Sequence, residues 1–387
     1  MSHGAASAKR RQSDGVRCEN ARRHLARPTR VKEQKFTLIQ AFRGFAALWV
    51  VLFHASEGHH IDSIRATTPT WLDSTVFDFG HLGVAVFFAL SGFVIAHSIR
   101  GAAITLRYFG RFALRRSIRL DPPYWASIAF VIAFAVLSSR VKHEPFGGVS
   151  TGQVAAHLSY TQELLRFTEI NPVFWTLTYE VQFYVILVLG IMLAQRTRVP
   201  AGFLLLVPLI LTASSWAGAF SVFGLFTNLW PCFLVGAFGY WGIESRVYAA
   251  AACALGVAVL IIHPAQFEAV SMATGLGLLL AGRVGYLEAM DWRPVQFLGA
   301  ISYSLYLTHN PVTGATFFVL SKAHVPEPVA LVLTLCICIA IAALFWWLFE
   351  RPAIRLAQRI KMRNLANYPK GVSPGFVSLS EREVHER

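Results

Sequence analysis

Apolar runs about as long as a bilayer is thick recur along this chain, and they limit the folds that it can adopt. A helix needs about 20 apolar residues to cross the hydrocarbon core of roughly 30 Å. The composition agrees, since 55% of the 387 residues are hydrophobic, 14% are charged and the mean hydropathy is +0.49. We therefore predict an all-α, polytopic bundle of about ten transmembrane helices, a multi-pass protein of the cell (inner) membrane. The apolar runs lie at roughly 36–55, 80–99, 122–139, 172–194, 201–216, 220–243, 247–263, 267–282, 294–318 and 328–349.

The basic residues predict the orientation of this bundle. Cytoplasmic loops and tails of membrane proteins carry an excess of Lys and Arg. With the N-terminus inside, the ten runs leave Arg43 within a helix and only five basic residues on the outer side: Arg65, Arg140, Lys142, Arg166 and Lys322. We therefore expect both termini to be cytoplasmic. The expected parts are a disordered basic tail (1–35), the transmembrane domain (36–355) and a polar tail (356–387).

The net charge of +14 follows this topology rather than forming one basic patch. Nucleic acid is therefore not an expected partner. The five cysteines have no metal-binding or redox spacing. The histidines around the first outer loop lack a carboxylate or cysteine at ligand spacing, so we expect no metal and no permanently bound cofactor.

Two basic residues interrupt the first apolar run. Burying Arg at a helix centre costs about 2.5 to 3.5 kcal/mol on insertion scales, so such residues suggest a function. Arg43 and His54 are eleven residues apart, which places them on one helical face about 16 Å apart along the axis. They either line a common path or, alternatively, sit at the two interfaces, where Arg43 would snorkel to lipid headgroups.

The fourth run carries a carboxylate. Glu180 and Tyr184 share a helical face at i and i+4. Glu180 requires a buried partner, which is either another helix's donor or an imidazole suited to proton transfer near neutral pH.

A basic cluster, "RFALRRSIRLDPPYW" (111–125), precedes the third run. Anchoring on the cytoplasmic side explains part of it. Arg116 and Arg119, at i and i+3, also face one way, and paired guanidiniums match phosphate oxygens. We expect them at a cytoplasmic mouth that binds a ligand with several phosphates.

Taken in order, these motifs resemble the acyltransferase-3 family of integral membrane O-acyltransferases. The resemblance extends from about Phe36 to Arg355 and includes, besides Arg43, His54, Arg116 and Arg119, the segments "GVAVFFALSGFVI" from Gly83, "WTLTYEVQFY" in the fourth run, "SYSLYLTHNPV" in the ninth and "FERP" at the end.

The resemblance implies transfer of an acyl group, commonly acetyl, from cytoplasmic acyl-CoA to a carbohydrate hydroxyl. By motif matching, His54 would be catalytic, with Glu180 and Arg43 supporting it. Arg116 and Arg119 would bind the phosphates of the co-substrate acyl-CoA, and Tyr184 would belong to the substrate-binding site.

Several alternatives stay open at the level of sequence. His54 acts as a general base or as a nucleophile that briefly carries the acyl group. Glu180 is preferred over Glu57 as its orienting carboxylate, because Glu57 is expected in the wet outer loop. His309 either binds substrate or makes an interhelical hydrogen bond, and Glu350 is expected to fix a helix end. The alternative function is a proton-coupled secondary transporter. The acceptor and the oligomeric state are left open.

Overall fold

The structure, a computed structural model, describes residues 36–197, 199, 201–219 and 222–362. Within this part every regular element is a helix. The first half contains α2 (Thr37–Glu57), α3 (Asp62–Thr67), α4 (Thr70–Val76), η1 (Asp78–Leu82), α5 (Gly83–Ser98), α6 (Leu106–Lys142), α7 (Thr151–Leu158) and α8 (Trp175–Thr197). The second half contains α9 (Ala201–Trp216), η2 (Phe226–Leu229), α10 (Trp230–Gly242), α11 (Arg246–Ile262), α12 (Gln266–Arg283), η3 (Tyr286–Glu288), α13 (Arg293–Lys322), α14 (Glu327–Phe345), the π-helical η4 (Trp346–Glu350) and α15 (Arg351–Arg359).

The helices correspond closely to the apolar runs, since each of the ten runs overlaps one of them. Five segments of the described chain are long and apolar enough to cross a membrane: Thr37–Glu57, Thr70–Ser98, Leu106–Lys142, Trp175–Thr197 and Glu327–Arg359. The all-α, multi-pass character is thus confirmed. The count of ten spans and the cytoplasmic termini stay predictions.

The third run begins much earlier than expected. We placed its start at residue 122, but α6 begins at Leu106 and continues through Pro122 and Pro123. Proline is tolerated in such helices when neighbouring groups satisfy the backbone it frees. The two prolines free the carbonyls of Ile118 and Arg119, four residues before them, and Tyr303 Oη donates to the adjacent Leu120 carbonyl oxygen, 3.1 Å away. Arg116 and Arg119 therefore lie inside a helix and not in a loop before one.

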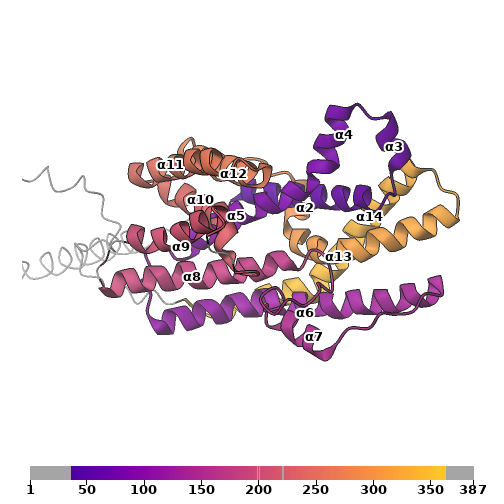
Figure 1. The fold of residues 1–387 in the computed structure, drawn as a ribbon, viewed down its shortest axis with the longest axis horizontal. Helices are drawn as coiled ribbons and strands as arrows, with labels where there is room; N and C mark the ends of the chain where they lie inside the picture. The colour runs from indigo at the N-terminus through magenta and orange to yellow at the C-terminus, as the bar shows by residue number, and fades with distance from the viewer. Residues whose placement is uncertain (1–35, 198, 200, 220–221, 363–387) are drawn as a thin grey trace, which may run out of the picture. The chain divides into compact units, whose positions relative to one another are not determined.

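Helix α2 runs through the middle of the bundle, packed against α13 and α5 (Figure 1). Glycines permit the close approach, because a Cβ at Gly44 would meet the backbone of Gly299 on α13. The contact of α5 with α10 is similar: a Cβ at Gly92 would meet the Phe233 carbonyl, and one at Gly236 the Ala89 carbonyl. These backbone contacts determine which part of each neighbouring helix the polar side chains of α2 and α5 face.

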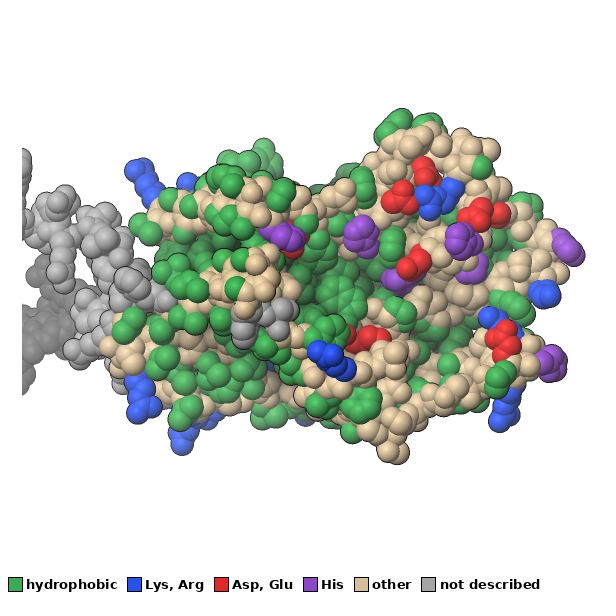
Figure 2. Space-filling model, in the orientation of Figure 1, with side chains coloured by type: hydrophobic (Ala, Val, Ile, Leu, Met, Phe, Trp, Pro, Cys, Tyr) green, Lys and Arg blue, Asp and Glu red, His purple; other side chains and the backbone are tan. Residues whose placement is uncertain are grey.

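Helices α3 and α4 form a cap that lies above the right-hand half of α2 in the view of Figure 1. Arg65 holds the cap together, since its guanidinium bonds Asp73 at 2.8 Å, Asp78 at 2.6 Å and Ser56 Oγ at 2.5 Å. On the face drawn in Figure 2, Asp, Glu and His side chains gather toward the right-hand end, while hydrophobic side chains cover most of the remainder.

The two predicted tails lie mostly outside the residues that the structure describes. Residues 1–35 and 363–387 lie outside the described residues. The expected boundary at residues 355 and 356 falls inside α15, which continues to Arg359.

Candidate functional site

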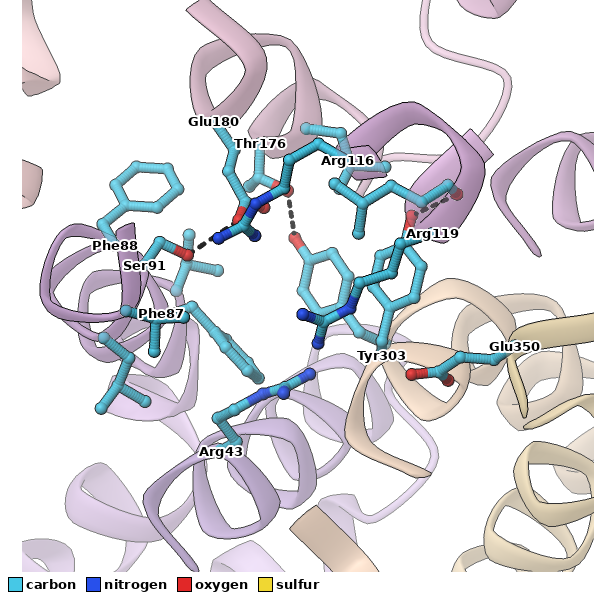
Figure 3. Close-up of a pocket in the computed structure, with 16 residues that line it drawn as sticks. Arg43, Phe87, Phe88, Ser91, Arg116, Arg119, Thr176, Glu180, Tyr303 and Glu350 are labelled. Carbon is cyan, nitrogen blue, oxygen red and sulfur yellow. Dashed lines mark hydrogen bonds between the residues drawn. The ribbon is translucent and has the colours of Figure 1, made fainter. Parts of the chain in front are cut away.

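A cavity of about 90 Å³, lined by both apolar and charged residues, lies inside the bundle. Its walls come from α2, α5, α6, α8, α13 and η4, so segments from both ends of the sequence meet there. Hydrophobic residues such as Phe87 and Phe88 form part of the lining (Figure 3). The charged residues that line it are Arg43, Arg116, Arg119, Glu180 and Glu350.

Three guanidiniums point into this cavity from two helices (Figure 3). Arg43 comes from α2, and Arg116 and Arg119 from α6, so the i, i+3 spacing does bring the two arginines of α6 to one place. In the described part of the chain none of the three donates a hydrogen bond or closes an ion pair. Guanidiniums with unused donors are suited to bind an anion with several oxygens.

Two carboxylates accompany the arginines. Glu180 Oε1 accepts a hydrogen bond from Ser91 Oγ at 2.8 Å and lies beside Arg116 (Figure 3). Glu350 Oε2 accepts from Ser304, from Oγ at 2.6 Å and from the backbone N–H at 3.2 Å. If all five groups are ionised, the three arginines exceed the two carboxylates by one positive charge. The cavity therefore favours an anionic ligand.

Tyr184 is buried beneath one of these arginines. The guanidinium carbon of Arg116 lies 4.8 Å from the centre of the Tyr184 ring, a cation–π distance. Tyr184 itself is not among the residues that line the cavity. Its contact with Arg116 suits it to hold the guanidinium in place, whereas we had expected Tyr184 to contact substrate.

His54 lies at a second level, near the end of α2. Its Nδ1 lies 2.9 Å from Glu57 Oε2, and 12% of the His54 side chain is exposed. The expected pairing of His54 with Glu180 is wrong. Glu180 bonds Ser91 at the cavity, in the second turn of α8, whereas His54 bonds Glu57, three residues further along α2. A solvent-exposed carboxylate can still orient an imidazole when helix geometry brings it within reach.

His309 on α13 faces His54, with ring centres 5.2 Å apart. The His309 side chain is fully buried, and its Nδ1 lies 2.9 Å from the Tyr306 carbonyl oxygen and 3.1 Å from that of Leu305. Carbonyl oxygens only accept, so Nδ1 carries the hydrogen. Nε2 has no hydrogen-bond partner in the described chain.

A series of ring contacts leads from the cavity through Tyr306 to the two imidazoles. Arg43 and His54 are about 16 Å apart along α2 by helical rise. Tyr306 lines the cavity, donates from Oη to the Val173 carbonyl at 3.0 Å, and has its ring centre 6.0 Å from that of His309. Tyr306 thus contacts both the cavity and His309, although neither imidazole lines the cavity itself.

A separate cluster of titratable groups lies between α7 and α8. His157 is fully buried, with Nδ1 2.8 Å from the Gln153 carbonyl and Nε2 3.1 Å from Glu169 Oε2. Burial, together with the neighbouring Glu169, raises the pKa of Glu163 to about 7. This cluster does not line the cavity.

Several polar residues of the cavity were not assigned to the site from sequence. Ser91, Thr176, Tyr303, Tyr306 and Glu350 all line it, and Glu350 was expected only to fix a helix end. The segments "GVAVFFALSGFVI", "WTLTYEVQFY", "SYSLYLTHNPV" and "FERP", on which the family resemblance depends, contain these residues. The resemblance was the available signal, but which neighbour each side chain faces depends on how the helices pack. No group of three or more His, Cys, Asp or Glu in the described chain is arranged to hold a metal ion.

Comparisons with known proteins agree with the motifs. A family model described as an acyltransferase domain matches residues 37–347. Nodulation protein 10 of Rhizobium leguminosarum bv. viciae is 26% identical over 84% of this chain and 95% of its own length. The putative membrane-bound transacylase BcsY of Komagataeibacter xylinus is 27% identical over 74% of this chain and 75% of its own length.

A third relative is the exopolysaccharide production protein ExoZ of Rhizobium meliloti (strain 1021), which is 27% identical over 79% of this chain and 95% of its own length. No solved structure matches the chain.

Proposed function

Since the chain belongs to the acyltransferase-3 family of membrane O-acyltransferases, we propose that it transfers an acyl group, in the simplest case acetyl, from cytoplasmic acyl-CoA to a carbohydrate hydroxyl. The proposal rests on the cavity, whose three guanidiniums make no hydrogen bond or ion pair with the described residues, and on the ring contacts that lead through Tyr306 and His309 to His54. Acyl-CoA has phosphates at one end and its thioester at the other, with the extended pantetheine arm between them.

In this proposal Arg43, Arg116 and Arg119 bind the phosphates. Phosphate oxygens would accept the hydrogen bonds that these guanidiniums do not make with the residues that the structure describes. Glu180 and Tyr184 act as positioning residues, because Glu180 lies beside Arg116 and Tyr184 packs beneath it. The arm then leads the thioester toward His54.

His54 is the proposed catalytic residue. Glu57 accepts from Nδ1–H, so the lone pair of Nε2 is available. As a general base, Nε2 takes the proton of the acceptor hydroxyl while its oxygen bonds to the acyl carbon. The carbon–sulfur bond breaks, and the proton passes from His54 to the sulfur of CoA. As a nucleophile, Nε2 would instead carry the acyl group between two such steps.

The predicted membrane orientation suits a donor and an acceptor that arrive from opposite sides of the membrane. Under the ten-span arrangement with cytoplasmic termini, Arg116 lies toward the cytoplasm and His54 in the outer half. Carbohydrate is proposed as the acceptor because one relative is named for exopolysaccharide production. Bacterial relatives favour the inner membrane as the location.

The test is the release of CoA by purified protein in lipid nanodiscs, supplied with acetyl-CoA and bacterial exopolysaccharide. We expect CoA release that depends on the polysaccharide, together with an acetyl ester on the product by mass spectrometry. CoA release without an ester would contradict carbohydrate as the acceptor. No CoA release with any acyl-CoA would contradict the donor.

A further inference from the structure

Two imidazoles, whose Nε2 atoms have no hydrogen-bond partner among the described residues, lie side by side near the end of α2. His54 and His309 have ring centres 5.2 Å apart at an interplanar angle of 39°. Each has its Nδ1 engaged, His54 with Glu57 and His309 with two backbone carbonyls. Each imidazole therefore presents Nε2 as its remaining polar atom.

The unpartnered Nε2 of His309 is unusual, because buried polar atoms nearly always have a hydrogen-bond partner. His309 is completely buried, and none of its described contacts is a carboxylate, so the neutral ring is favoured. With the hydrogen on Nδ1, Nε2 of the neutral ring can only accept. The missing partner is therefore a donor.

His54 cannot be that donor while it acts on a hydroxyl. Its own Nε2 must present a lone pair to the reacting hydroxyl, and no hydrogen bond joins the two rings in the described chain. One hydroxyl carries one hydrogen and satisfies only one of the two nitrogens. Both Nε2 atoms accept a hydrogen bond when a ligand supplies two neighbouring donors.

We infer that His54 and His309 together recognise an acceptor with two adjacent hydroxyls, a vicinal diol. The hydroxyl that donates to His54 Nε2 is acylated, and its neighbour donates to His309 Nε2 and fixes the orientation of the first. This inference rests on the proposed function, and it makes His309 a specificity-determining residue.

The test compares octyl β-D-glucopyranoside and octyl β-D-galactopyranoside with their monodeoxy analogues as acceptors of acetyl from acetyl-CoA. Mass spectrometry and NMR of the products identify the acylated position. For the wild-type protein, removal of the hydroxyl adjacent to that position should lower kcat/KM for the acceptor about tenfold to hundredfold, because it leaves the buried His309 Nε2 unpaired.

The His309→Leu variant should lose the same factor on the parent glycoside and show no additional loss on the deoxy analogue, since the two changes remove one interaction. His309→Gln, whose amide oxygen can accept, should recover part of the loss. The matched control is His157→Leu, which removes another fully buried imidazole with Nδ1 on a backbone carbonyl. This control should keep the full preference for the adjacent hydroxyl.

Equal kcat/KM of the wild type for parent and deoxy glycosides would overturn the inference while leaving the proposed function intact. A preference that persists in His309→Leu would also overturn it. If no glycoside in the panel is acylated, that result contradicts both the inference and carbohydrate as the acceptor. Binding of acetyl-CoA to each variant, measured by calorimetry, shows that its donor cavity is folded.

Discussion

The pair Arg116 and Arg119 offers the sharpest test of the donor cavity. We expect the Arg116→Gln, Arg119→Gln double variant to raise the KM for acetyl-CoA far more than the KM for the acceptor. A hydrogen bond to a charged group contributes about 1.5 to 3 kcal/mol. Two lost guanidinium–phosphate contacts therefore correspond to about 3 to 6 kcal/mol, or roughly 10² to 10⁴ in KM.

The assay measures initial rates of CoA release with acetyl-CoA and with acetyl-pantetheine, which lacks all the phosphates. The wild type should strongly prefer acetyl-CoA, and the double variant should lose most of that preference. Lys at both positions should restore it only partly, because an ammonium neither forms the bidentate fork nor stacks in the same way over Tyr184.

Arg115→Gln is the matched control, because Arg115 is an exposed neighbour on α6 that does not line the cavity. It should leave the KM for acetyl-CoA close to that of the wild type. A double variant that kept the preference for acetyl-CoA over acetyl-pantetheine would contradict phosphate binding by Arg116 and Arg119. Full restoration of the preference by Lys at both positions would also contradict it. In that case the arginines would serve only to anchor α6.

Three further predictions concern other parts of the molecule. Glu57→Gln should lower kcat about tenfold or more without changing the KM for acyl-CoA, because it weakens the contact that orients His54; an unchanged kcat would remove that role. Reporter fusions should score as external after Ser63 and cytoplasmic after Gly101, and the reverse pattern would invert the membrane orientation. Glu163 has a raised pKa of about 7, so the folded state binds more protons than the unfolded state between about pH 4.5 and 7, and its burial costs stability as the pH rises. Glu163→Gln should thus raise the melting temperature at pH 8 more than at pH 5, and equal shifts would contradict this.

The helical architecture was largely predictable because hydrophobic length and periodicity are local properties of the chain. Each predicted run overlaps a helix, and the i, i+3 spacing correctly placed Arg116 and Arg119 on one face. The start of α6 was missed because Pro122 and Pro123 read as a helix boundary. They nonetheless lie inside α6, which continues to Lys142.

The pairing of charged groups between helices was less predictable. Glu180 and His54 were expected to pair because each is ionisable within an apolar run, but sequence carries little information on relative depth or rotation. Close packing at Gly44 and Gly299 sets how α2 meets α13, and this brings His309 against His54. The partner of His54, Glu57, was the local candidate three residues away and was rejected on its expected exposure. That exposure is real, at 61% of the side chain, yet the contact forms.

The central claim is that one site takes the acyl group from the cytoplasmic side and delivers it on the other. The most direct test uses sealed inside-out membrane vesicles loaded with exopolysaccharide and supplied externally with acetyl-CoA labelled in the acetyl group. We expect vesicles with the wild-type protein to accumulate label as ester on the enclosed polysaccharide, and vesicles with the His54→Gln variant to show at least about 10²-fold less. Labelling that required acetyl-CoA and polysaccharide on the same side would contradict transfer across the membrane. Labelling at the wild-type rate in vesicles with the His54→Gln variant would contradict the catalytic role of His54.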